Sequence, residues 1–311
     1  MGEEQHRPRC LALFSGGLDA LLAVRLIERF AVSIEPVWVR TPCKARETEV
    51  RAACKLLNLP LTVLEPPDDF ADVLRTPVRS GASSSPCRDC RVAIFRAARR
   101  YADTSGADFA ISGEVLGQDL RLQRRRDLDM LAIAAGWEDR LVRPLSARRL
   151  DETLPERRGW LDRTQLLDLH GQSRRPQHAL AQEWNLDPTC AAPSTCALTD
   201  AFLHEQVQRA LTLPDFSPWL VALLRSGRCE WLDEQTLVVI SRRESEGQQL
   251  AELFHRPDKP AGCRFVELVD VPGPSAIVVG RSTIEQLATA QSLVAGRAKV
   301  GVNDVRWRIT P

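Results

Sequence analysis

The stretch Cys10-Leu11-Ala12-Leu13-Phe14-Ser15-Gly16-Gly17-Leu18-Asp19 decides the fold that this 311-residue sequence predicts. Its first five residues are apolar, which is typical of a short buried strand, and the two glycines favour a tight turn. Apolar residues then recur at roughly helical spacing, at Leu21, Leu22, Val24, Leu26 and Ile27. A strand, a glycine turn and a helix in this order are the opening unit of a parallel α/β sheet.

The same alternation continues as far as residue 112. Strand-like and helix-like stretches follow one another at 34–39, 47–57, 61–64, 92–101 and 109–112, of which the second and fourth are expected helices. A polar loop at 80–85 leads into Pro86-Cys87-Arg88-Asp89-Cys90, so this Cys-x-x-Cys pair stands at a helix start. We therefore expect a parallel, Rossmann-like α/β sheet in a first domain, residues 1–200.

The chain is about twice as long as a typical domain, and its pattern changes after residue 200. Within the first domain, residues 113–200 are rich in arginine and weakly periodic, so we expect loops and short helices there. Beyond it, strands are expected at 236–240, 265–269, 276–279 and near 300–307, with helices at 244–254 and 283–295. These elements form a second, smaller α+β domain, residues 201–311.

Composition excludes some classes of protein. Hydrophobic residues make up 44% of the chain and charged residues 27%, which is ordinary for a soluble globular protein. The net charge of +1 gives no overall attraction to nucleic acid or membrane, so any polyanion site must be a local patch. The sequence has no apolar run of membrane-span length and no signal-peptide pattern, which favours a cytoplasmic location. Nine cysteines, two of them in the Cys-x-x-Cys pair, indicate metal binding or catalysis rather than disulfides.

Ser15-Gly16-Gly17-Leu18-Asp19 has the chemistry of an anion-binding loop. Backbone N–H groups at a helix start bind phosphate together with the helix dipole, and glycines let the phosphate approach closely. The Ser15 hydroxyl adds a donor, and Asp19 is suited to hold Mg²⁺ or to fix the loop. No Gly-Lys-Ser/Thr ending follows, so the loop is not a Walker A motif. The alternative is a plain strand-to-helix turn in which Asp19 is an early-helix acid.

Four segments resemble one family in the same order. The first, Ser15 to Ala20, resembles the Ser-Gly-Gly-x-Asp-Ser signature of PP-loop ATP pyrophosphatases. Pro86-Cys87-x-x-Cys90, the segment 111–118 (Ile-Ser-Gly-Glu-Val-Leu-Gly-Gln) and the segment 196–200 (Cys-Ala-Leu-Thr-Asp) resemble tRNA 2-thiouridylase-like sulfurtransferases of the MnmA type. This resemblance covers roughly residues 9–205.

The chain departs from the family pattern at three places. Ala20 stands where the family usually has serine, which removes one hydroxyl from the phosphate-binding loop. Ala192-Pro193-Ser194-Thr195 replaces Pro-Ala-Gly-Gly before the third cysteine, and Asp119-Leu120-Arg121 replaces Arg-Pro-Met after Leu-Gly-Gln. The last two departures indicate that acceptor recognition differs from that of the relatives.

The resemblance implies a PP-loop domain of the adenine nucleotide alpha hydrolase type and an ATP-dependent sulfurtransferase. Such an enzyme adenylates a carbonyl oxygen, here expected on a tRNA uridine, releases pyrophosphate, and replaces the oxygen with sulfur from a donor. Asp19 and the three cysteines would be the catalytic residues. The resemblance implies that ATP and Mg²⁺ bind at Ser15, Gly16, Gly17, Leu18, Asp19, Ser112, Gly113 and Glu114.

The cysteines are the expected sulfur and metal site. Cys87 and Cys90 are close enough in sequence to share one metal, and the resemblance supplies Cys196 as a third thiolate. Three thiolates with one open coordination position suit a [4Fe-4S] cluster, which we expect. Two alternatives stay open: a persulfide on one cysteine without a cluster, and structural zinc with Cys190 as fourth ligand. The remaining cysteines are expected to be packing or surface residues: Cys10, Cys43, Cys54, Cys229 and Cys263.

Arginines within residues 113–200 are the expected tRNA-binding side chains. Each phosphate that a protein cation neutralises adds affinity that falls with salt. The candidates are Arg121, Arg124, Arg125, Arg126, Arg148 and Arg149. The alternative is a solvated surface balanced by Asp127, Asp129, Asp151 and Glu152. The second domain resembles a divergent NFACT-R domain, a predicted RNA-binding module, at 237–241 and 269–274.

Two other functions fit the same residues. The altered segment at 119–121 permits a small-molecule acceptor for the same adenylation followed by thiolation or ligation. Ala20 and the divergent second domain permit a non-catalytic RNA-binding or iron–sulfur protein. Pyrophosphate release from ATP with a candidate acceptor would separate the two enzymes from the non-catalytic protein.

Overall fold

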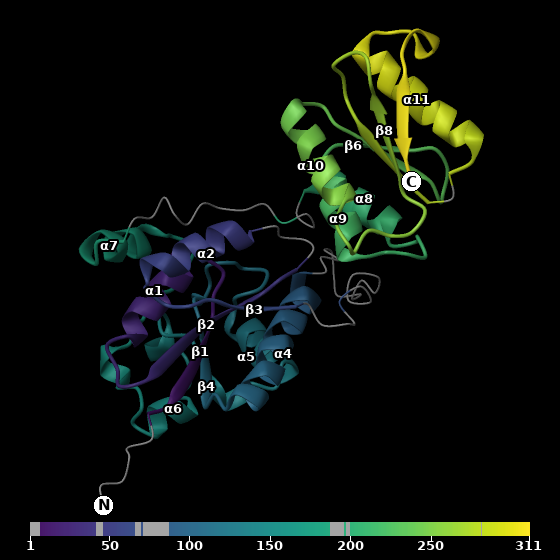
Figure 1. The fold of residues 1–311 in the computed structure, drawn as a ribbon. Coiled ribbons are helices and arrows are strands. Elements are labelled where there is room, and N and C mark those ends of the chain that lie inside the picture. Colours follow the sequence, from purple (N-terminus) through teal and green to yellow (C-terminus); the bar gives the residue numbers. More distant parts are fainter. Residues whose placement is uncertain are drawn as a thin grey trace, which may run out of the picture. The chain divides into compact units, whose positions relative to one another are not determined.

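The computed structural model of the chain describes residues 7–41, 46–65, 70, 87–186, 196, 200–280 and 282–311. Their contacts divide them into two compact units (Figure 1). The first unit holds the described residues up to 186, and the second holds those from 196 onward. The expected domain boundary at residue 200 stays a prediction, since residues 187–195 and 197–199 lie outside the described part.

The first unit is built on a parallel five-stranded sheet in the order β3-β2-β1-β4-β5. Its strands are β1 (Arg9–Leu13), β2 (Ser33–Val39), β3 (Thr62–Leu64), β4 (Phe109–Ser112) and β5 (Leu141–Val142). Every neighbouring pair of strands is parallel. The predicted α/β class with a parallel sheet is therefore confirmed, and β5 is a strand that the sequence pattern does not predict.

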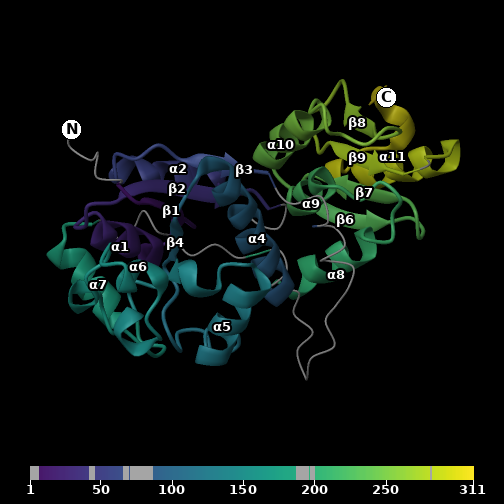
Figure 2. The same ribbon diagram turned by 90° about the horizontal axis from the view of Figure 1, so that it is seen from below.

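Helices cover both faces of this sheet (Figure 2). They are α1 (Leu18–Ile27), α2 (Glu47–Leu56), α4 (Cys87–Ser105), α5 (Arg125–Ala134), α6 (Leu154–Arg157) and α7 (Arg175–Glu183). Along β1, Cys10 and Ala12 join the core beneath α1, α2 and α7, whereas Leu11 joins the core beneath α4 and α5. Because successive strand side chains point to opposite faces, one apolar strand supports both layers.

The second unit is an antiparallel sheet in the order β10-β8-β9-β7-β6, accompanied by helices. Its strands are β6 (Arg228–Trp231), β7 (Leu237–Ile240), β8 (Arg264–Leu268), β9 (Ala276–Val279) and β10 (Trp307–Thr310). Its helices are α8 (Ala201–Ala210), α9 (Pro218–Arg225), α10 (Glu244–Phe254) and α11 (Ile284–Ala298). This architecture agrees with the predicted α+β class. Within the described residues of the chain, none of the helices combines the length and the apolar content that crossing a bilayer requires.

Some elements of the second unit differ from the sequence prediction. The prediction lacks α8, α9 and β6. α9 is only eight residues long, and β6 buries only Cys229 among its four residues, so neither carries a long periodic pattern. The last strand begins at Trp307 rather than near residue 300. Asn303 and Asp304 lie instead in a single 3-10 turn, which their side chains favour.

A close backbone approach fixes the edge of the first sheet. The strand order reverses at β1, so the loops that follow β1 and β4 are neighbours. A Cβ atom on Gly113, the residue after β4, would lie 2.5 Å from the amide nitrogen of Ala20. It would also lie 2.6 Å from the carbonyl carbon of Asp19. Only glycine allows this approach, because the neighbouring atoms are backbone.

Replacing Gly113 by alanine is expected to force the two loops apart. We expect Gly113→Ala to lower the free energy of unfolding by about 2 kcal/mol or more, because backbone cannot give way as a flexible side chain can. Urea unfolding measures the change. Gly296→Ala within α11 is the matched control, since its Cβ would meet no atom within 4 Å and alanine favours a helix. Wild-type stability of Gly113→Ala would contradict the close approach.

Candidate functional site

The Ser15–Asp19 loop joins β1 to α1. Gly16 has a φ of +71°, in the left-handed region that glycine adopts without strain, and a Cβ there would lie 3.0 Å from Cα of Val50. Gly17 is the N-cap of α1 and offers no side-chain acceptor to the first turn, while its own N–H lies 3.4 Å from Oγ of Ser15. Backbone N–H groups in such a first turn lack intrahelical partners and bind anions.

Asp19, in the first turn of α1, has one carboxylate oxygen bound and one without a partner. Its Oδ2 accepts a hydrogen bond from Nε2 of Gln118 at 2.8 Å and lies 3.4 Å from Nη2 of Arg174. Its Oδ1 is buried and has no hydrogen-bond partner among the described residues. Carboxylate oxygens are ligands that Mg²⁺ prefers, and a buried polar atom normally has a partner. The chemistry of Asp19 therefore suits Mg²⁺, and its role stays a prediction.

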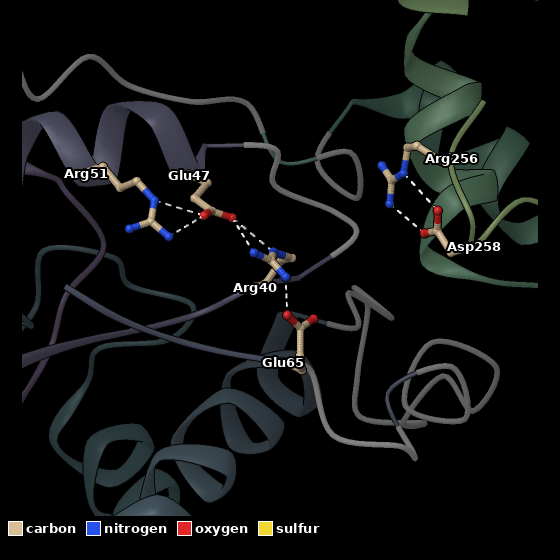
Figure 3. A network of polar contacts seen from close by, with 6 residues as sticks. All are labelled: Arg40, Glu47, Arg51, Glu65, Arg256 and Asp258. Atoms are coloured by element: carbon tan, nitrogen blue, oxygen red, sulfur yellow. Dashed lines mark hydrogen bonds and ion pairs between the residues drawn. The ribbon is translucent and has the colours of Figure 1, made fainter. Parts of the chain in front are cut away.

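An ion-pair network holds α2 beside the loop (Figure 3). The guanidinium of Arg40, after β2, donates to the first residue of α2, Glu47, at 2.7 and 3.0 Å, and also contacts Glu65. Glu47 accepts two further bonds from Arg51 at 2.6 and 2.9 Å. Burial raises the pKa of Glu47, but the two guanidiniums outweigh it and hold that pKa below its ordinary value. The network thus fixes the helix that contacts the glycine turn.

Glu114, just after β4, lies in a buried charge cluster. Its Oε2 accepts hydrogen bonds from Oγ of Ser112 at 3.1 Å and from Nε of Arg143 at 2.9 Å. Arg91 of α4 forms an ion pair with Oε1. Burial lowers the pKa of Arg91 and of Arg143 to about 10. The carboxylate predicted to contact the nucleotide is thus held by two arginines, and its contact with a ligand stays a prediction.

Cys87 and Cys90 lie one helical turn apart at the start of α4, and both are partly exposed. Because α4 leads back into β4 of a parallel sheet, its start lies at the carboxyl edge of the strands, where the Ser15–Asp19 loop also lies. The hydrogen bond with Asp119 raises the pKa of Arg121, and burial lowers the pKa of Arg91, which directly follows Cys90, to about 10.

The three predicted cysteine ligands belong to different units. Cys87 and Cys90 are in the first unit, and Cys196 is in the second. Across the described part of the chain, no group of three or more His, Cys, Asp or Glu side chains forms a site for a metal ion. Cys190, the alternative zinc ligand, lies outside the described residues. Cluster, persulfide and zinc therefore all stay predictions.

Other cysteines are buried as packing residues. Burial raises the pKa of the Cys10 thiol well above its ordinary value. It also raises the pKa of Cys54 and of Cys263 to about 11, and that of Cys229 to about 12. Thiols with such raised pKa values are poor nucleophiles and poor metal ligands. Cys43 lies outside the described residues.

The predicted RNA-binding arginines divide into two groups. In the first group a carboxylate already pairs with each cation: Arg121 with Asp119, Arg125 with Asp151, and Arg148 and Arg149 with Asp168. In the second group, Arg124 and Arg126 form no side-chain ion pair or hydrogen bond with any residue that the structure describes. Together with Arg88, Asp127 and Met130 they line a hollow of about 290 Å³, which we call the arginine hollow, and Arg88 forms an ion pair with Asp127 there.

Sequence reasoning misses several residues of the site. They are Gln118, Arg174 and Gln177 around Asp19, and Arg91 and Arg143 around Glu114. Two of them carry a usable signal, since Gln118 ends the segment that resembles the family and Arg91 directly follows the Cys-x-x-Cys pair. The other three have partners far away along the chain, and no local pattern marks such contacts.

Comparisons with known proteins give distant matches. No protein-family model matches the chain. The uncharacterised protein MJ1599 of Methanocaldococcus jannaschii is 27% identical over 141 residues, which are 44% of this chain and 50% of that protein. The chain thus spans about half the length of this curated relative.

Two solved structures resemble the chain weakly. The U34-tRNA thiolase NcsA from Methanococcus maripaludis, with its [4Fe-4S] cluster, has a TM-score of 0.36 and 16% identity, over 66% of this chain and 65% of that one. A predicted subunit of tRNA methyltransferase from Methanocaldococcus jannaschii has a TM-score of 0.31 and 14% identity, over 60% of this chain and 93% of that one. At such TM-scores the likeness adds nothing to what the chain's own residues support.

Removing the charge of Glu114 is expected to leave the buried guanidinium of Arg143 and the partly buried guanidinium of Arg91 without their ion-pair partner. Glu114→Gln should therefore lower the free energy of unfolding by about 3–5 kcal/mol, measured by urea unfolding. Glu183→Gln on the exposed face of α7 is the matched control, since Glu183 has no ion pair among the described residues, and it should change stability by less than about 0.5 kcal/mol. An equally small effect at Glu114 would show that the cluster does not depend on its carboxylate.

Proposed function

We propose that this chain is an ATP-dependent sulfurtransferase that adenylates a carbonyl oxygen of a tRNA uridine and replaces it with sulfur. One observation carries the proposal: the Ser15–Asp19 loop, Gly113 and the cysteine-bearing start of α4 share one edge of a parallel sheet. Ligands of open α/β sheets bind at this edge, where the strand order reverses. An anion-binding loop and two thiols at one edge suit activation by a nucleotide followed by transfer of sulfur.

The Ser15–Asp19 loop supplies contacts that a triphosphate needs. N–H groups of the first turn of α1 bind phosphate oxygens. Gly16 and Gly17 have no side chains that would block the approach of the phosphates. Asp19 would hold Mg²⁺ through Oδ1, and the bound ion neutralises phosphate charge. The same N–H groups stabilise the charge that develops on phosphate while the uridine oxygen attacks the α-phosphorus and pyrophosphate leaves.

Sulfur then replaces the activated oxygen. Hydrosulfide from a donor attacks the carbon that carries the adenylate, so a C–S bond forms and the C–O bond breaks. AMP leaves with the former carbonyl oxygen, and the sulfur loses its proton. The step therefore needs no oxidant or reductant.

Cys87 and Cys90 are the side chains proposed to hold the incoming sulfur. Both are partly exposed and one helical turn apart, and this donor set suits a thiolate-bound cluster. A [4Fe-4S] cluster, when bound, supplies a coordination position for a sulfur ligand. Cys196 is the proposed third ligand. The iron content of a Cys196→Ala variant tests this assignment.

Thiolation and pyrophosphate release test the reaction. Anaerobic incubation with ATP, Mg²⁺, sulfide and unmodified tRNA should release pyrophosphate and yield a thiolated nucleoside detectable by mass spectrometry. Asp19→Ala should lower both products by about 100-fold or more, whereas Cys87→Ala should abolish the thiolated nucleoside. Cys54→Ala, a change at a buried thiol outside the site, is the control that should retain activity. The absence of pyrophosphate release with tRNA and with small carbonyl acceptors would exclude both the tRNA sulfurtransferase and the enzyme with a small-molecule acceptor.

Iron and sulfide analysis tests the cofactor. Anaerobically purified wild type should contain about four iron atoms per chain, and Cys87→Ala, Cys90→Ala and Cys196→Ala should each lose most of them. Tightly held zinc in place of iron would support the structural alternative. Full iron in Cys196→Ala would remove this residue from the ligand set.

The arginine hollow is the proposed contact with RNA phosphate. Replacing Arg124 and Arg126 together by alanine should weaken tRNA binding by about tenfold or more. It should also reduce the slope of log K against log salt by about two units, because each lost phosphate contact removes slightly less than one unit. The control replaces Arg148 and Arg149, which Asp168 already neutralises, and should change affinity by less than about threefold. Affinity for tRNA is measured across a salt series. Equal losses of affinity in the hollow variant and in the control variant would contradict the assignment of RNA binding to the arginine hollow.

A further inference from the structure

Helix α7 lies in the segment that the sequence assigns to the acceptor, yet it packs against α1 (Figure 1). Arg174 is its N-cap residue, and Gln177 lies one turn into the helix. Both side chains contact the residues around Asp19 rather than an RNA-facing surface. The start of α7 therefore belongs with the nucleotide loop.

Two amides link α7 to Asp19. Nε2 of Gln177 donates to Oε1 of Gln118 at 2.7 Å, and Nε2 of Gln118 donates to Oδ2 of Asp19 at 2.8 Å. Gln177 is only 1% exposed, so the two hydrogen bonds begin at a side chain buried inside the unit. A side-chain amide both accepts and donates hydrogen bonds, so Gln118 accepts from Gln177 and donates to Oδ2 of Asp19. Neither amide donates to Oδ1. The amides fix the orientation of the carboxylate and leave Oδ1 for another ligand.

Arg174 supplies the cation of this group. Its Nη2 lies 3.4 Å from Oδ2 of Asp19, and its side chain is 43% exposed. A guanidinium carries five N–H donors in a planar fork, so one contact with a carboxylate leaves others for a phosphate. A triphosphate in the Ser15–Asp19 loop would bring several negative charges next to Asp19. These negative charges and the Asp19 carboxylate repel one another, and a neighbouring cation offsets the repulsion.

We propose that Arg174 binds the terminal phosphates of ATP, and that Gln118 and Gln177 are positioning residues that orient Asp19 toward the metal. The proposal rests on the nucleotide site proposed above and adds to it a phosphate ligand from a distant helix. Arg174 neutralises Asp19 before the nucleotide binds. It then shares its guanidinium between the carboxylate and the phosphates.

Nucleotide binding measured by calorimetry tests Arg174 without requiring thiolation. In the presence of Mg²⁺, Arg174→Ala should raise the Kd of a non-hydrolysable ATP analogue by about 10- to 100-fold, because it removes a charge-assisted contact to phosphate. AMP lacks the terminal phosphates, so its Kd should change by less than about threefold. Arg175→Ala is the matched control, since this neighbouring arginine is exposed and forms no side-chain hydrogen bond or ion pair with described residues.

Mg²⁺ titration tests the positioning pair. Gln177→Leu should raise the Mg²⁺ concentration for half-maximal binding of the analogue by about tenfold or more, as loss of a residue that orients a ligand does. Binding without Mg²⁺ should stay within about twofold of wild type, and thermal unfolding of each variant reports its folding. An unchanged Mg²⁺ dependence would overturn the positioning role.

The outcomes separate this inference from the proposed function. Wild-type affinity of Arg174→Ala for the analogue, or equal losses for the analogue and AMP, would overturn the phosphate contact while leaving the nucleotide site intact. Failure of the wild type to bind either nucleotide would overturn both the inference and the proposed function.

Discussion

The backbone contact between Gly113 and the start of α1 is the constraint on which the edge of the first unit depends. Because main-chain atoms meet main-chain atoms there, no repacking of side chains could make room for a Cβ atom on residue 113. The loops after β1 and β4 are thereby locked together. The positions of Asp19 on one loop and Glu114 on the other are therefore fixed relative to each other. Asp19 pairs with Arg174 at the start of α7, and Glu114 pairs with Arg91 of α4 and with Arg143 after β5.

The sequence predicts the regular part of the fold well for physical reasons. β1, β2 and β4 are mostly apolar, and α10 carries a clear amphipathic pattern between residues 244 and 254, so local signals agree with the final structure. β5 shows where such signals end. Leu141-Val142 is too short to have a period, and it becomes a strand only because β4 offers a parallel partner.

The same distinction applies to the site. The glycine loop and the Cys-x-x-Cys pair are local patterns, and reading them locates the relevant edge of the sheet. Charge pairing is not local: Asp168 neutralises Arg148 and Arg149, whereas Arg124 and Arg126 stay unneutralised by described residues. A sequence counts these arginines but cannot rank them, because the fold decides which carboxylate reaches which cation.

Arg91 directly follows Cys90 and forms an ion pair with the buried Glu114, so this pair fixes how the start of α4 is rotated. An α-helix rotates by about 100° per residue. One residue inserted between Cys90 and Arg91 would therefore rotate both sulfur atoms by about 100° around the helix axis. The Arg91–Glu114 ion pair would keep the rest of α4 in place. The direction of the two thiols is therefore set by the spacing between the Cys-x-x-Cys pair and Arg91.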